Sequence, residues 1–250
     1  MKNFFKENYK FIIFMCLFGL VGGYFSGKYL IESYTDDVLN QVIKQLGSKS
    51  MLIVVAMIQS LFYSFILGSI GIYLSKRIGL WKKISYDKHS FKISILFGII
   101  GGLLLILPDV FIFNNLSTKI SDIYMNKPSI NFILSGITYG GIVEEILMRL
   151  FLMSFVSFII YKIFYRKSKI NDNVYIISNI IVSLLFALGH LPNTLMTIGL
   201  NFIIIFRCIL LNGIVGLIFG YVYRKYGVIY SMISHVLVHI VSKIIWIIFI

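Results

Sequence analysis

The chain has 250 residues, of which 58% are hydrophobic and only 13% are charged. A soluble domain is nearer half apolar and a quarter charged, so this composition excludes an ordinary soluble protein. The net charge of +13 comes from Lys and Arg in short loops, which fits the positive-inside rule better than nucleic-acid binding. Several apolar runs of about 20 residues, without strand-like alternation, predict an all-α polytopic membrane helix bundle rather than a β-barrel.

About seven or eight transmembrane helices are expected in this bundle. Their predicted ranges are 9–26, 51–75, 93–113, 130–160, 174–191, 195–223 and 228–250. Pro192 closes the fifth span, and an eighth would arise if the sixth were broken near Arg207. The segment 27–50 is mixed in charge and fits an amphipathic interfacial helix. We expect residues 1–129 to form about three helices without motifs, and residues 130–250 to form the candidate catalytic core of four or five helices, within one continuous membrane domain.

The positive charges predict the orientation of the chain. Lys2, Lys6 and Lys10 precede the first apolar run, and no A-x-A-like site follows it, so we expect an uncleaved first span. Alternating spans from a cytoplasmic N-terminus place the basic loops 76–92, 161–173 and 224–227 inside. A multi-pass protein of the cell membrane is expected, with the lipid bilayer around it. No repeat is visible, which counts against an inverted-repeat transporter.

Two carboxylates and a guanidinium lie deep in the fourth span, where charges are costly unless they face protein or water. Glu145 and Arg149 are four residues apart and share a helix face, so we expect a structural ion pair. Glu144 points about 100° away and is free to act as a general base. The alternative is that all three form a structural ion cluster.

Three histidines lie within or at the ends of predicted spans: His190, His235 and His239. The last two are spaced as the zinc ligands of H-E-x-x-H, but Val236 stands where that motif has Glu. They can instead donate hydrogen bonds to an oxyanion. No metal is therefore assigned. If zinc were bound, its ligands would come from Glu144 and these three histidines.

Other polar and small residues in the spans have structural explanations. Asn212, Gly216 and Gly220 recur every four residues and predict a packing stripe, from which Asn212 could also donate a hydrogen bond into the site. Gly140 permits the close approach of another helix or a substrate. Asp109 follows a proline near the end of the third span and is expected to be interfacial.

Four short patterns occur in a fixed order along the second half of the chain. They are Glu144-Glu145…Arg149, Phe186…His190, Asn212…Gly216 and His235…His239. Together they resemble the motifs of the CPBP intramembrane proteases, which include type II CAAX prenyl endopeptidases and bacterial Abi proteins. The resemblance covers about residues 130–245.

The resemblance implies roles for the motif residues. Glu144 would activate water with help from His190, and His235 and the residue four later would stabilise the oxyanion. Glu145 and Arg149, with Phe186 and Asn212, would support the site. Relatives usually carry Asn or Asp where this chain has His239. The preferred mechanism depends on glutamate and needs no cofactor, and a zinc mechanism is the alternative.

The expected function is an intramembrane endopeptidase that hydrolyses a peptide or a membrane-associated protein. The abundance of Ile, Lys, Asn and Phe suggests an AT-rich bacterial genome. Resemblance to bacterial members implies peptide maturation, bacteriocin self-immunity or surface-protein regulation. The rival hypothesis is a non-catalytic immunity or scaffold protein that binds a peptide partner, and a proton-coupled transporter is a more distant one. The sequence does not indicate an oligomeric state.

Overall fold

The computed structural model describes residues 2–165 and 170–249. This part of the chain contains helices and no strand, as predicted. It holds 7 helices that are long and apolar enough to cross a membrane: Phe4–Ser33, Lys49–Arg77, Lys88–Leu116, Ile130–Phe164, Asp172–Ile198, Phe202–Tyr226 and Val228–Phe249. The protein is therefore a multi-pass membrane protein built as an all-α bundle. The proposed division at residue 130 stays a prediction.

The first three spans are built from several helical segments. They comprise α1 (Lys2–Ser33), then α3 (Lys49–Phe62), η1 (Tyr63–Leu67) and α4 (Gly68–Arg77), then α5 (Lys88–Pro108), η2 (Asp109–Phe113) and α6 (Asn114–Leu116). Two short helices connect spans: α2 (Asp36–Leu46) and α7 (Thr118–Tyr124). The first of these is polar on one side and buries Leu39 on the other, which fits the amphipathic helix predicted for 27–50.

The fourth span contains an unusually long π-helical region. Its segments are α8 (Ile130–Ser135), η3 (Gly136–Glu144), η4 (Ile146–Met153) and α9 (Ser154–Phe164). π-helical turns are usually short and often occur at functional sites. The α-helical geometry assumed for Glu144 and Glu145 in the sequence analysis was therefore wrong. The side chains of Glu144 and Glu145 nevertheless have different surroundings, since Glu145 is fully buried and Glu144 is partly exposed.

The boundary between the fifth and sixth spans also differs from the prediction. Pro192 does not close the fifth span, because α10 (Asp172–Gly189) is followed directly by α11 (Leu191–Ile198). Proline is tolerated in the first turn of a helix, where its missing N–H would have no partner. The sixth span, α12 (Phe202–Tyr226), starts later than predicted and is not broken near Arg207. The last span is α13 (Val228–Phe249).

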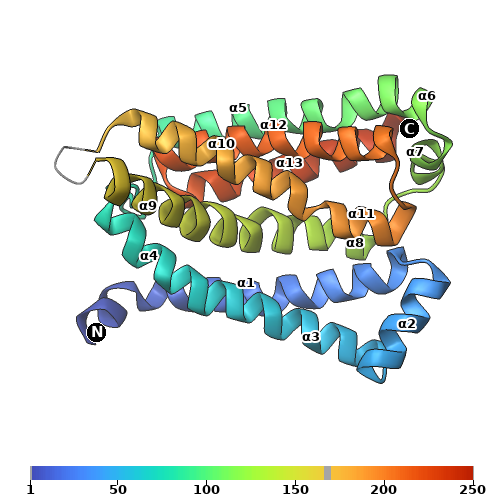
Figure 1. Ribbon diagram of the computed structural model, residues 1–250, viewed down its shortest axis with the longest axis horizontal. Coiled ribbons are helices and arrows are strands. Elements are labelled where there is room, and N and C mark those ends of the chain that lie inside the picture. Colours follow the sequence, from blue (N-terminus) through green and yellow to red (C-terminus); the bar gives the residue numbers. More distant parts are fainter. Residues whose placement is uncertain (1, 166–169, 250) are drawn as a thin grey trace.

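The helices are arranged in layers, with the motif-bearing fourth span in the middle. Figure 1 shows α1, α3 and α4 below that span and α5, α10, α12 and α13 above it. The π-helical segment η3 packs against both α1 and α13, and η4 packs against α4. The fourth span is thus surrounded by other helices, so its charged residues can find protein partners.

The basic loops gather at the N-terminal end of the bundle. Lys76 Nζ lies 3.1 Å from Asn8 Oδ1, and Arg224 pairs with Asp172 at 2.5 Å. The C-terminus lies at the opposite end, with α2, α7 and α11 (Figure 1). The orientation that the sequence predicts from the basic loops stays a prediction.

Candidate active site inside the bundle

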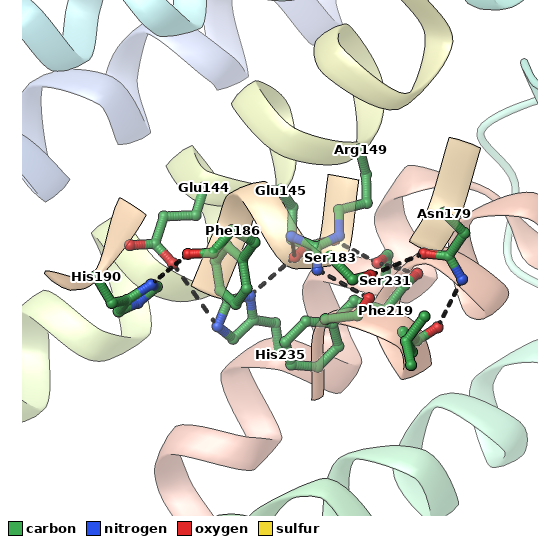
Figure 2. A network of polar contacts seen from close by, with 12 residues as sticks. Glu144, Glu145, Arg149, Asn179, Ser183, Phe186, His190, Phe219, Ser231 and His235 are labelled. Carbon is green, nitrogen blue, oxygen red and sulfur yellow. Dashed lines mark hydrogen bonds and ion pairs between the residues drawn. The ribbon is translucent and has the colours of Figure 1, made fainter. Parts of the chain in front are cut away.

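Glu145 is the centre of a buried polar cluster. Its side chain has no exposed surface, and Arg149, which is 1% exposed, brings Nη1 to 3.3 Å from Oε1. His235 Nδ1 lies 2.9 Å from the same oxygen, and Ser231 donates its hydroxyl proton to Oε2 (Figure 2). The geometry contains the Glu145–Arg149 pair expected from the sequence and adds a histidine and a serine from α13.

The Arg149 side chain is held by groups from two further helices. Its Nη2 donates to the Gly216 carbonyl at 3.0 Å, and its guanidinium lies 4.6 Å from the Phe186 ring centroid and 5.2 Å from that of Phe219. Aromatic faces attract cations most effectively when both are removed from water. Phe186 therefore packs against the guanidinium of the buried ion pair.

His235 is oriented by ring contacts with Phe219 and His239. The ring stacks on Phe219 at 4.0 Å between centroids and on His239 at 5.0 Å. Because a carboxylate only accepts hydrogen bonds, Nδ1–H donates to Glu145. Nε2 then faces Glu144, whose Oε2 is 4.0 Å away. The ring is thus fixed with one edge toward each glutamate.

Glu144 and His190 line a cavity of about 720 Å³ inside the bundle. Glu144 is 19% exposed, in contrast to its fully buried neighbour. His190 stands at the junction of α10 and α11, and its Nδ1 lies 2.8 Å from the Phe186 carbonyl oxygen. Donation to that carbonyl leaves Nε2 as an acceptor. Figure 2 shows both residues at one end of the polar network, away from Arg149.

His239 also lines the cavity and lies close against the fourth span. Its Nδ1 is 3.1 Å from Lys243 Nζ, and its Nε2 is buried without a hydrogen-bond partner among the described residues. A Cβ on Gly140 would lie 2.5 Å from that Nε2, and one on Gly136 would lie 3.0 Å from Nδ1. The glycines therefore provide the space that the imidazole occupies, as expected for Gly140.

The stripe on α12 packs against α10, as predicted. A Cβ on Gly216 would lie 3.1 Å from Ser183 Cβ, and one on Gly220 would overlap Asn179. Asn212 lines the cavity, but its Nδ2 donates to the Cys208 carbonyl at 2.9 Å, within its own helix. The side-chain NH₂ group of Asn212 therefore already donates a hydrogen bond within α12.

Asp109 forms a second buried ion pair on the cavity wall. It is 1% exposed, so its predicted interfacial position was wrong. Arg207 Nε lies 2.5 Å from Asp109 Oδ1, and Tyr124 donates to Oδ2 at 2.5 Å. This acid is the partner that Arg207 needed in the membrane.

Comparison with known proteins identifies the segment that carries this site. Residues 126–241 match the family described as type II CAAX prenyl endopeptidase Rce1-like. This segment is similar to that family. No curated protein and no solved structure gives a match.

All four motifs lie within the Rce1-like segment. This similarity suggests a membrane protease activity for the segment. The helices before residue 126 add α1 and α3, which supply part of the cavity wall. The Rce1-like site is therefore completed by helices outside the matched segment.

The proposed zinc ligands do not converge as a metal site requires. In the described part of the chain, no group of three or more His, Cys, Asp or Glu side chains could hold a metal ion. The rings of His235 and His239 are stacked with 19° between their planes, and His235 Nδ1 is already bonded to Glu145. Lys243 also places its amine beside Nδ1 of His239. A positively charged amine there would repel a metal cation.

Two residues of the Rce1-like site were missed from the sequence. Nothing in the sequence indicated Ser231, because serine is common in membrane helices and its partner Glu145 lies on another span. The sequence did contain an indication of Lys243. This residue follows His235 and His239 at the same spacing of four and therefore shares their helix face.

Proposed function

We propose that this protein is an intramembrane endopeptidase in which Glu144 activates water for attack on a peptide bond. The observation that carries the proposal is the contrast between the two adjacent glutamates. Glu145 is paired with Arg149 and His235, whereas Glu144 lies on the wall of the cavity. A general base must be able to reach the proton that it removes, and of the two only Glu144 has that access.

In the proposed reaction, water lies between the Glu144 carboxylate and His190 Nε2 and donates a hydrogen bond to each. Its oxygen bonds to the carbonyl carbon of the substrate as one proton passes to Glu144. The C–N bond then breaks as Glu144 returns this proton to the amine nitrogen. The products are a new carboxyl group and a new amine, and Glu144 regains its starting charge.

Two ring N–H groups are suited to stabilise the oxyanion formed in this step. His239 accepts from Lys243 at Nδ1 and so carries its proton on Nε2, the atom that lacks a partner. His235, when protonated, is held as an imidazolium by Glu145 and presents Nε2–H beside Glu144. Preorganised donors of this kind stabilise charge that develops in the transition state. The proposed mechanism uses no metal or other cofactor.

The substrate in this proposal is a peptide or a membrane-associated protein. We propose that the protein's biological role is peptide maturation, bacteriocin self-immunity or surface-protein regulation. We further propose that the N-terminus is cytoplasmic, since the basic loops lie at its end of the bundle. The cavity extends toward the opposite end, where Tyr34, Ile123 and Ile198 line it. A substrate would then enter from the non-cytoplasmic side.

The test replaces the base without changing the shape of the side chain. Glu144→Gln is expected to lower turnover about 10²–10⁴-fold, the usual contribution of a general base. His190→Ala is expected to lower it as well, and 1,10-phenanthroline is expected to leave it unchanged. Glu7→Gln is the matched control, because Glu7 is 68% exposed and lies away from the cavity.

The measurements are cleavage of a prenylated CAAX peptide in proteoliposomes and mapping of new protein termini in membranes of expressing cells. Both use variants that accumulate to wild-type levels. Wild-type cleavage or an unchanged cellular phenotype in Glu144→Gln would contradict the proposal. That result would favour the non-catalytic peptide-binding protein.

A further inference from the structure

Lys243 is a buried amine on the wall of the cavity. It is 5% exposed and lies on α13 one turn after His239. Its Nζ lies 3.1 Å from His239 Nδ1 and 4.3 Å from the centroid of the Phe132 ring. A Cβ on Gly136 would come within 2.9 Å of the same nitrogen, so the absence of a side chain there leaves room for it.

The other two buried cations of the site have acidic partners. Arg149 pairs with Glu145, and Arg207 pairs with Asp109. No carboxylate of the described residues lies within the 4.0 Å ion-pair distance of Lys243. A buried charge without a counter-charge is unfavourable, and a cation at membrane depth is usually paired or functional.

Neither acid of the described cavity lining pairs with Lys243. Of the described residues that line it, Asp109 and Glu144 are the acids. Asp109 is engaged by Arg207 and Tyr124, and Glu144 approaches His235 and not Lys243. A carboxylate on a molecule that enters the cavity can therefore supply the negative charge that Lys243 lacks.

We propose that Lys243 binds a carboxylate of the substrate. The inference rests on the proposed function in taking the cavity as the substrate site. His239 uses one proton of the ammonium group, and the other two are available to a carboxylate. The carboxylate is either the C-terminal group of the substrate or an Asp or Glu side chain.

The spacing on α13 indicates where this carboxylate lies along the substrate. Lys243 is eight residues after His235, which corresponds to about 12 Å along the helix axis at 1.5 Å per residue. An extended peptide covers that distance in about four residues. Lys243 thus binds a negative charge that lies within a few residues of the scissile bond, and this bond is placed beside Glu144 and His235.

The test measures binding in the Glu144→Gln background, so that it does not depend on cleavage. The probes are a pool of N-acetylated apolar hexapeptides, made once with a free C-terminal carboxylate and once as C-terminal amides. A second pair of amide-capped pools contains one internal Asp or one internal Asn. Dissociation constants are measured with the full chain in lipid nanodiscs. We expect a preference of about tenfold or more for the carboxylate member of one pair, as for a hydrogen bond to a charged group.

Substitutions at Lys243 connect that preference to this residue. Lys243→Met should abolish the preference, and Lys243→Arg should retain part of it. Lys127→Met is the matched control, because Lys127 is exposed and does not line the cavity. Thermal unfolding of each variant checks its folding. A merely structural Lys243 would weaken all probes equally and leave the ratio unchanged.

The outcomes separate this inference from the proposed function. A preference for free C-termini assigns the terminal carboxylate, and a preference for Asp over Asn assigns a side chain. Equal binding of both members of each pair by the protein with Lys243 intact, or no binding of any pool, overturns the inference. Loss of cleavage in Glu144→Gln is a separate result, so either idea can fail while the other stands.

Discussion

Glu144 and Glu145 are adjacent residues with different surroundings. Glu145 is enclosed by Arg149, Ser231 and His235, whose positive and hydroxyl groups compensate its burial. Glu144 borders the cavity and touches this cluster only through the 4.0 Å approach to His235. The difference arises from the neighbouring helices, and it supports one residue as a base and the other as part of the framework.

At the residue scale, His239→Asn tests the departure from the family pattern. The amide of Asn can donate a hydrogen bond as His239 Nε2 does, so we expect proteolysis within about tenfold of wild type. His239→Ala removes the donor and should lower turnover about 10²–10³-fold, as at other oxyanion sites. Cleavage assays in proteoliposomes measure both. Equal loss in the two variants would mean that His239 has a role that a neutral donor cannot fill.

At the element scale, the fourth span is held in the bundle by close helix contacts. Gly71 on α4 packs against the backbone of η4, and a Cβ there would lie 2.7 Å from the Leu150 carbonyl oxygen. Backbone cannot move aside as a flexible side chain can. The position of the π-helical segments, and with it that of Glu144, therefore depends on contacts made by the N-terminal helices.

Gly71→Ala should consequently destabilise the protein by about 1–3 kcal/mol, the usual cost of overpacking. Gly213→Ala is the matched control, since a Cβ at Gly213 would meet nothing within 4 Å. Alanine is the better helix former, so this control should be neutral or stabilising by up to about 1 kcal/mol. Thermal unfolding in detergent compares the two. Equal midpoints would show that α4 can shift without cost.

At the scale of the whole molecule, the cavity and the basic loops lie toward opposite ends. The N-terminus, the end of α4 and the start of α10 share one end, and α2, α7, α11 and the C-terminus share the other (Figure 1). Seven spans place the termini on opposite sides of a membrane. With the cytoplasmic N-terminus proposed from the positive-inside rule, the cavity would open on the non-cytoplasmic side.

Cysteine labelling tests that orientation. Lys127→Cys lies on the side of the cavity opening, and Lys83→Cys lies in a basic loop. With Cys16 and Cys208 replaced by Ser, a membrane-impermeant maleimide should label position 127 in intact spheroplasts. Position 83 should be labelled only after lysis. The reverse pattern would invert the proposed topology and give the cavity a cytoplasmic opening.

The sequence predicted the spans and the motif residues because hydropathy and helix spacing are local properties. It also predicted the Glu145–Arg149 pair, whose members are one turn apart on the same span. It failed at the junction of α10 and α11, where proline at a helix start resembles proline at a helix end. It could not foresee the π-helical backbone, because η3 and η4 have ordinary apolar sequences.

By itself, the sequence determined that this is a membrane helix bundle and which residues could carry its chemistry. Only the tertiary structure decided their partners. His235 reaches Glu145 across 90 positions, and Arg207 reaches Asp109 across 98. Such contacts depend on how the helices pack, which no local pattern specifies. The same packing leaves Glu144 on the cavity wall and Lys243 beside it without an acid partner.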